Sequence, residues 1–275
     1  MKGHMQTQWQ ALAFGAENED PLWEMFHENS KLTGLEPSIS NEELREYASD
    51  LYRSLPFDGF PIVSLPKRMP LLSNPLDRAM QSNIAVRKIN SRLLPLNQLA
   101  ALLYYSFGAT RTAARSGPRK SLRILPPTGT FYSLEIFIHA ANVRSVSKGL
   151  YHYNPFLHHL RLLRDGNLAD EIVWCFAPNT VPPHASLIIF ITAIFERATF
   201  VYGNRGYRFA LKEAGSVAQN FNLVSSSLGL ASVGMDDFFD RRVDTFLQVD
   251  GITHSAVHTL AIGKASRQRH GRQAQ

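Results

Sequence analysis

The chain has 275 residues, of which 44% are hydrophobic and 19% are charged, and its formal net charge at pH 7 is +6. This composition is that of an ordinary soluble globular protein with one or two domains. The single cysteine, Cys175, excludes an intrachain disulfide framework and a multi-cysteine zinc or iron–sulfur site, and it favours a reducing, cytoplasmic setting.

Neither a membrane span nor a signal peptide is expected. The longest apolar run, residues 185–195, is far shorter than the roughly 20 residues that a spanning helix needs. The first twenty residues contain three acidic side chains and no apolar segment. We therefore expect no membrane partner.

Residues 1–75 differ from the rest and are predicted to form an N-terminal arm. Ser40 and Glu43 have the spacing of a capping box, which predicts a short helix over 41–52. Five prolines between positions 56 and 75 then keep the chain extended. Such a segment cannot form its own core, so we expect it to lie over the body of the protein or over a partner subunit.

From residue 76 the pattern of apolar residues becomes regular and predicts an ordered domain. Helices are expected after Leu76, over 96–107 and over 167–176. Strands are expected over 134–140, 186–195 and 256–262, with a hairpin between 149 and 166. His152, His158 and His159 lie in that hairpin, but they lack a Glu or Cys partner at ligand spacing, so we interpret them as residues of a half-exposed strand rather than a metal site.

Cations are concentrated in two segments, one before residue 124 and one at the end of the sequence. They are Arg111, Arg115, Arg119, Lys120 and Arg123, and Lys264, Arg267, Arg269 and Arg272. Neither cluster has interleaved aromatic residues, and the chain has no recognisable nucleic-acid module, so we expect no nucleic-acid partner. An anionic ligand, an anionic peptide or plain solvation explains the clusters better.

A long helix over 207–228 is the predicted centre of the fold. Its apolar residues recur every three or four positions, its length is roughly 33 Å at about 1.5 Å per residue, and Gly229 supplies a stop. Gly215 in mid-helix predicts a close approach to the backbone there. Gln219 and Asn220 interrupt the apolar pattern and predict a partner with donors and acceptors, such as a heterocycle.

The residues around this helix form a signature. Tyr202-Gly203-x-Arg205-Gly206-Tyr207-Arg208 is followed by Glu213-x-Gly215, Gln219-Asn220 and Gly229-Leu230. This pattern resembles the SagB/McbC-type branch of the nitroreductase superfamily, whose members are FMN-dependent dehydrogenases that oxidise azoline rings to azoles in ribosomally made, modified peptides. The resemblance extends from about residue 76 to residue 263.

The resemblance implies an α+β nitroreductase-like fold, in which helices surround a mixed sheet and a long central helix. It also implies a homodimer that holds two FMN at its interface. The domains would then be the arm (1–75), the FMN domain (76–265) and a basic tail (266–275). The implied partners are cyclodehydratase subunits and a precursor peptide.

The same resemblance suggests which residues contact FMN. Arg87 corresponds to the last arginine of the family's Arg-Arg-Ser-x-Arg motif, although a surface arginine would look the same. The segment from Arg123 through Thr128 and Gly129 is similar to the loop that lines the flavin, or is simply a proline turn. Gln219 and Asn220 complete the set, and Lys264 and Arg267 follow the last strand, where basic residues commonly reach the FMN phosphate.

The resemblance assigns proton transfer to Tyr202. The family has a Lys-Tyr pair at this place, whereas this chain has Val201-Tyr202. A phenol is a poor base at neutral pH unless a cation assists it, so Tyr202 would depend on Arg205, Arg208 or Lys212. Two alternatives therefore stay open: an NAD(P)H-dependent nitro or quinone reductase, and a scaffold subunit of a peptide-modifying complex that has lost the reaction.

Overall fold

The computed structural model describes residues 21–34, 39–40, 42–44, 54–82, 89–90, 92–113, 120–129, 131–182 and 184–265. Its helices are α2 (Leu22–Asn29), α4 (Leu76–Ser82), α5 (Leu96–Phe107), α6 (Ala169–Trp174), α7 (Glu196–Tyr202), α8 (Asn204–Ser227) and α9 (Asp240–Leu247). Its strands are β1 (Ile62–Ser64), β2 (Ile89–Asn90), β3 (Ala109–Ala113), β4 (Lys120–Arg123), β5 (Leu134–Ala140), β6 (Gly149–Asn154), β7 (His159–Asp165), β8 (Leu187–Ile194), β9 (Leu230–Gly234) and β10 (His254–Ala265).

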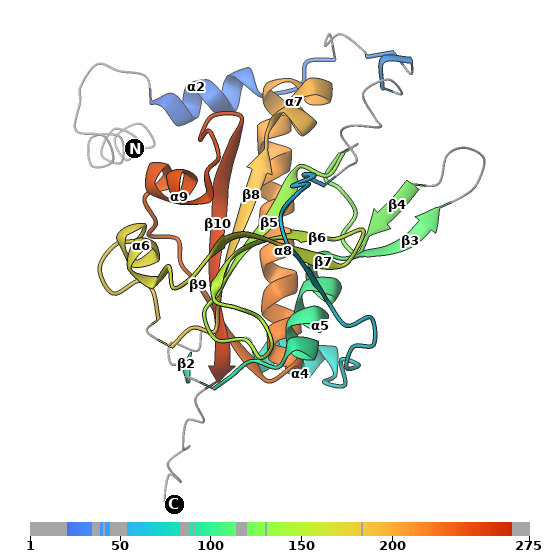
Figure 1. The fold of residues 1–275 in the computed structure, drawn as a ribbon. Coiled ribbons are helices and arrows are strands. Elements are labelled where there is room, and N and C mark those ends of the chain that lie inside the picture. Colours follow the sequence, from blue (N-terminus) through green and yellow to red (C-terminus); the bar gives the residue numbers. More distant parts are fainter. Residues whose placement is uncertain are drawn as a thin grey trace, which may run out of the picture.

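One eight-stranded sheet forms the middle of the protein (Figure 1). Its order is β1-β7-β6-β5-β8-β10-β2, and β9 also pairs with β10. All pairings between these strands are antiparallel, and the described residues have a parallel contact only at the isolated bridge between Leu94 and Val143. The predicted α+β class is therefore confirmed, but the sheet is antiparallel rather than mixed. Consecutive strands such as β5, β6 and β7 are joined too closely for crossover helices.

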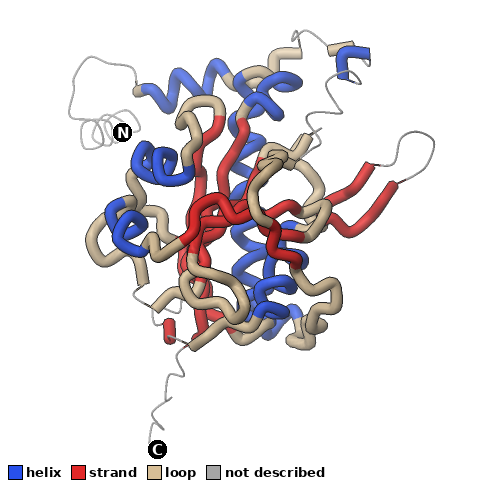
Figure 2. The backbone as a smooth tube through the Cα atoms, viewed as in Figure 1, coloured by secondary structure: helices blue, strands red, loops and turns tan. Residues whose placement is uncertain are grey.

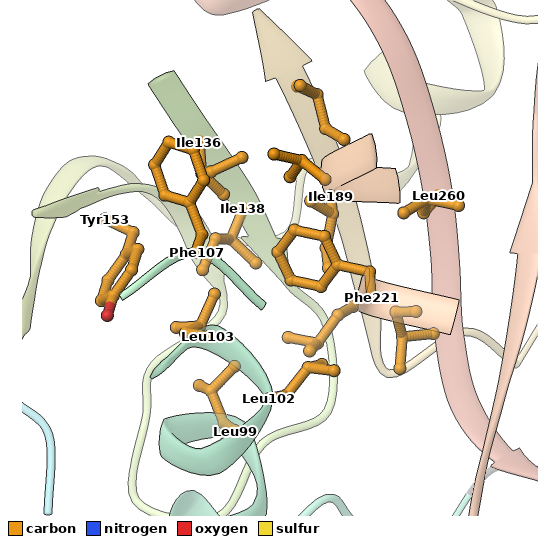
Figure 3. Packing of buried hydrophobic residues seen from close by; sticks show 14 of the residues in the cluster. Leu99, Leu102, Leu103, Phe107, Ile136, Ile138, Tyr153, Ile189, Phe221 and Leu260 are labelled. Carbon is orange, nitrogen blue, oxygen red and sulfur yellow. The ribbon is translucent and has the colours of Figure 1, made fainter. Parts of the chain in front are cut away.

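The larger hydrophobic core lies between the sheet and α8. Ala214, Val217 and Phe221 of α8 are buried there against strand residues such as Ile189 and Leu260. Helix α5 closes the same core with four large apolar side chains, Leu99, Leu102, Leu103 and Phe107 (Figure 3). This packing fixes α8 along the middle of the sheet.

A second core lies on the opposite face of the sheet. Phe137 of β5 and Phe190 of β8 pack there against Ile172 of α6 and Phe246 of α9. Figure 2 shows the strands gathered at the centre with helices around them. Since both faces are covered, every residue of β5 is buried, which explains why the central strands read as continuous apolar runs.

Most elements predicted from periodicity are confirmed. Helix α5 and strand β5 have their predicted bounds, and the β6–β7 hairpin is present. The central helix begins at Asn204 rather than Tyr207, and Gly229 adopts the left-handed conformation at its end (φ 64°). Residues 42–44 are helical and have the predicted capping box, with the Glu43 amide donating to Ser40 Oγ (3.2 Å), whereas the rest of the predicted 41–52 helix lies outside the described residues.

Two local predictions are wrong. His152 was expected on a half-exposed strand, but it is fully buried, because the segment carrying Phe57 covers the strand. Gly215 was expected to face a close neighbour, but a Cβ built there meets no described atom within 4 Å. None of the helices among the described residues could cross a membrane.

Candidate active site at the α7–α8 corner

The signature forms a tight corner between α7 and α8, and we call residues 199–205 the corner. Gly203 separates the two helices, because its backbone angles (φ 52°, ψ −141°) are not helical. A Cβ on Gly206 would lie 2.4 Å from the carbonyl carbon of Ala198, so only glycine lets α8 approach α7 this closely. The geometry of the corner therefore requires glycine at positions 203 and 206 of the signature.

The predicted flavin loop lies against this corner. Gly129 has φ 145°, and a Cβ there would lie 2.9 Å from Cε2 of Tyr202. The Tyr202 ring in turn makes an edge contact with Phe209, with ring centroids 4.9 Å apart. The structure thus brings together Gly129 and Tyr202, which are 73 positions apart in the sequence. The neighbour that requires a glycine here is the tyrosine ring.

A cavity of about 520 Å³ opens at the corner. Tyr202 and Val201 line one side of it, and a segment of the N-terminal arm lines the other. We call residues 29–33 and 39 the arm wall. The arm was expected to lie over the body of the protein, but its position at this cavity was not predicted, because helix α2, which precedes the arm wall, has no buried residue and no capping side chain.

Behind the corner lies a buried layer of charged residues. The Glu135 carboxylate accepts hydrogen bonds from Arg197 NH1 (2.7 Å), His152 Nε2 (2.9 Å) and Ser54 Oγ (3.0 Å). Burial acts to raise the pKa of Glu135, but the hydrogen bond from His152 and the charge of Arg197 outweigh it and hold the pKa well below its usual range. Glu135 therefore stays ionised and anchors α7 to the sheet.

Glu213 on α8 is a second buried carboxyl group near the same layer. It accepts a hydrogen bond from the Ser133 amide (3.2 Å). Burial raises its pKa to about 7, although the positive charge of Arg123 opposes the shift. A carboxyl group that titrates near neutral pH is typical of functional sites. Glu213 is part of the signature, but nothing in the surrounding sequence indicates that its carboxyl group is buried.

Arg123 is buried, so plain solvation, one of the explanations left open for the basic cluster, does not apply to it. It is 4% exposed, and its guanidinium lies 4.2 Å from the Phe107 ring centroid and 4.6 Å from that of Tyr132. Its NH1 donates to the carbonyl of Leu134 (3.0 Å). Its predicted contact with FMN stays a prediction.

The candidates Gln219 and Asn220 lie in the second half of α8. Gln219 is exposed, and Asn220 donates to the carbonyl of Ser106 (3.3 Å). At about 1.5 Å per residue, Asn220 is roughly 24 Å along the helix axis from the corner. Within one chain, the side-chain amides of Gln219 and Asn220 therefore do not share a small pocket with Tyr202. Thr128, by contrast, is half-buried beside Gly129.

Lys264 lies at the end of β10, where the surroundings suit an anion. Its Nζ donates to Gln98 Oε1 (3.0 Å). Burial, together with the positive charge of Arg92, lowers the pKa of Lys264. Two cations without a neighbouring carboxylate in their described surroundings favour a phosphate or similar group. Arg87 and Arg267 lie outside the described residues.

Comparisons of the sequence with a family model and with known proteins lead to the same family. Residues 138–264 match the nitroreductase family model. The protein MJ1384 of Methanocaldococcus jannaschii, which is named as a nitroreductase, is 31% identical over 165 residues, which are 60% of this chain and 80% of that protein. The microcin B17-processing protein McbC of Escherichia coli is 31% identical over 140 residues, which are 48% of this chain and 51% of McbC.

Solved structures agree in fold. A structure from Anabaena variabilis, also named as a nitroreductase, matches 85% of this chain and 49% of its own with a TM-score of 0.62 at 20% identity. A chain of the E. coli microcin synthetase McbBCD complex, solved with truncated pro-MccB17 bound, matches 90% of this chain and 92% of its own, with a TM-score of 0.56 at 19% identity. The chain thus spans about half the length of McbC and of the Anabaena protein.

Proposed function

Because the chain belongs to the nitroreductase family, we propose that it is an FMN-dependent dehydrogenase that oxidises azoline rings to azoles in a ribosomally made peptide. The observation that carries the proposal is the corner cavity, in which Tyr202 stands beside the Gly129 loop. The similarity to McbC over half of this chain supports the choice of substrate class. On this proposal the partners are a cyclodehydratase and its precursor peptide.

FMN needs a cationic site for its phosphate and polar groups along its heterocycle, and the chain offers both. Lys264 and Arg92 would hold the phosphate end, with Arg87 and Arg267 as further predicted contacts. Gln219 and Asn220 would serve the heterocycle, as would the backbone of Thr128 and Gly129 in the second subunit of a homodimer.

The reaction removes two hydrogens from adjacent ring atoms of the azoline, one of them as a proton. FMN, when bound, supplies the acceptor for the hydride. The Tyr202 hydroxyl would hold the departing proton, and the apolar side chains of Val201 and Phe200 in the cavity lining would limit access of water. Contact with Phe209 and the Gly129 loop fixes the phenol ring for this role.

The first experiment is an absorbance spectrum of the purified protein, recorded before and after adding azoline-containing peptide without oxygen. We expect a flavin band near about 450 nm that bleaches with the peptide. Tyr202→Phe should keep the band and slow the bleaching by about 100-fold or more, since general acid–base catalysis contributes roughly that much. Tyr105→Phe, a half-buried tyrosine on α5, is the matched control. A colourless protein that rejects FMN would refute the proposal and favour the scaffold alternative.

Similarity to MJ1384 over most of that protein's length favours a second candidate function, the NAD(P)H-dependent reduction of nitro or quinone compounds. The same purified protein should then oxidise NADH or NADPH when a nitroaromatic acceptor is added. Rapid oxidation of the nicotinamide in the presence of the nitroaromatic acceptor, with no bleaching of the flavin band by the peptide, would favour this function over azoline oxidation.

A further inference from the structure

The arm wall is held in place by the signature itself. Four contacts join α2 and the arm wall to the first turns of α8: the ring contact of Phe26 with Tyr207 (5.4 Å), a hydrogen bond from Arg208 Nη2 to His27 Nδ1 (2.6 Å), and hydrogen bonds from Asn204 Nδ2 to the Asn29 carbonyl and from Arg205 Nη1 to the Ser30 carbonyl (both 3.4 Å). Ser30 is buried as a result. The arm is thus an integral side of the corner cavity.

The lining of this cavity is cationic. It includes Lys31 from the arm wall and Arg205 from α8, and none of the described residues that line it is Asp or Glu. Lys31 does form an ion pair with Glu28 (2.5 Å), which lies one turn earlier. Both side chains of that pair are about half exposed, so the pair is weak and can exchange for another anion.

Arg205 has hydrogen-bonding capacity left over. Its Nε is buried and has no hydrogen-bond partner among the described residues, and the hydrogen bond from its Nη1 to Ser30 is long at 3.4 Å. Helix α8 also begins at this cavity with no side-chain cap and no acid in its first turn. A guanidinium nitrogen without a partner and the positive end of a helix dipole both favour a carboxylate ligand.

We propose that the cavity between the arm wall and the corner binds a carboxylate of the peptide substrate, through Lys31 and Arg205. The inference rests on the proposed function for its substrate class, and it makes the N-terminal arm part of substrate recognition. The carboxylate comes either from an acidic side chain or from the peptide's C-terminus.

Peptide binding measured by fluorescence anisotropy tests this without any turnover. The probes are rhodamine-labelled glycine–serine peptides that carry one glutamate or one glutamine, each made with a free or an amidated C-terminus. We expect the full chain to bind a carboxylate form about tenfold more tightly than its neutral counterpart, and the pair that differs identifies the source. Lys31→Met and Arg205→Gln should each reduce that ratio toward one.

Lys67→Met, which removes an exposed lysine outside the cavity, should leave the ratio unchanged. Equal binding of all four peptides by the unaltered protein would overturn the proposal, as would an unchanged ratio in Lys31→Met. Weaker FMN binding in Lys31→Met would also overturn it, by assigning the cavity to the cofactor. Failure of the peptide to bleach the flavin would count against the proposed function alone, since the binding ratio is measured separately.

Discussion

Replacing Arg197 tests the buried charged layer behind the corner. In Arg197→Met, the Glu135 carboxylate keeps His152 and Ser54 but loses its charged partner at 2.7 Å. Glu135 is fully buried and Arg197 nearly so, with side-chain exposures of 0% and 7%. Removing one member of such a pair costs about 3–5 kcal/mol of unfolding free energy, whereas exposed pairs contribute about 0–1 kcal/mol.

Urea unfolding at pH 7 measures this cost. With a slope of about 3 kcal/mol/M, the midpoint should fall by about 1–2 M. Lys31→Met, which breaks an exposed ion pair, should leave the midpoint unchanged. The double variant Glu135→Gln/Arg197→Met should recover much of the loss, because position 135 then no longer holds a buried charge without its partner. A loss below about 1 kcal/mol in Arg197→Met would refute the stabilising role assigned to this pair.

The ion pair between Glu135 and Arg197 also makes the free energy of unfolding depend on pH. Because the pKa of Glu135 is held below its ordinary value of 4.5, its contribution to stability is present above that value and is lost as the pH falls through the folded-state pKa. The stability difference between the unaltered protein and Arg197→Met should therefore shrink below about pH 4.5. A difference that grew on acidification would contradict the assignment.

Two further predictions concern α8. Gly206→Ala should destabilise the protein by about 1–3 kcal/mol in thermal or urea unfolding, because the new Cβ would clash with the Ala198 backbone. Gly215→Ala, in open space on the same helix, should be neutral or stabilising by up to about 1 kcal/mol. Equal losses of stability in the two variants would contradict the close approach at Gly206. Burial raises the pKa of Glu213 from 4.5 to about 7, so the folded state binds more protons than the unfolded state in that range, and stability falls as the pH rises through it. Glu213→Gln should remove about 3 kcal/mol of that fall between pH 4.5 and 7, and parallel stability–pH curves for the two proteins would disprove the shift.

Periodicity predicted the elements that pack against the core, because burial imposes a repeat on the sequence. Helices α5 and α8 have the 3.6-residue repeat, and β5 is an uninterrupted apolar run. Helix α7 was missed because its seven residues are too few for a repeat and it has no capping side chain. The same is true of α2, none of whose residues is buried.

The candidate site was predictable only through the resemblance to a family. Nothing local to Gly129 and Tyr202 indicates that they touch, and Arg197 and Glu135 lie 62 positions apart. The arm wall was missed for a related reason, since its contacts with Asn204 and Arg205 are made largely through backbone carbonyls. Backbone acceptors are present in every residue and leave no mark on the sequence.

The position of β10 has a consequence for synthesis in the cell. This strand pairs with β8 and β2 along one edge and with β9 along the other, yet it follows all three in the sequence. About 70 residues separate the ends of β8 and β10, so at about 5–20 residues per second the ribosome leaves the edge of β8 open for roughly 4–14 s. That edge is rich in isoleucine and is a template for pairing with other chains. Abundant chaperones should therefore raise the soluble yield, because they can cover this edge until β10 has been made.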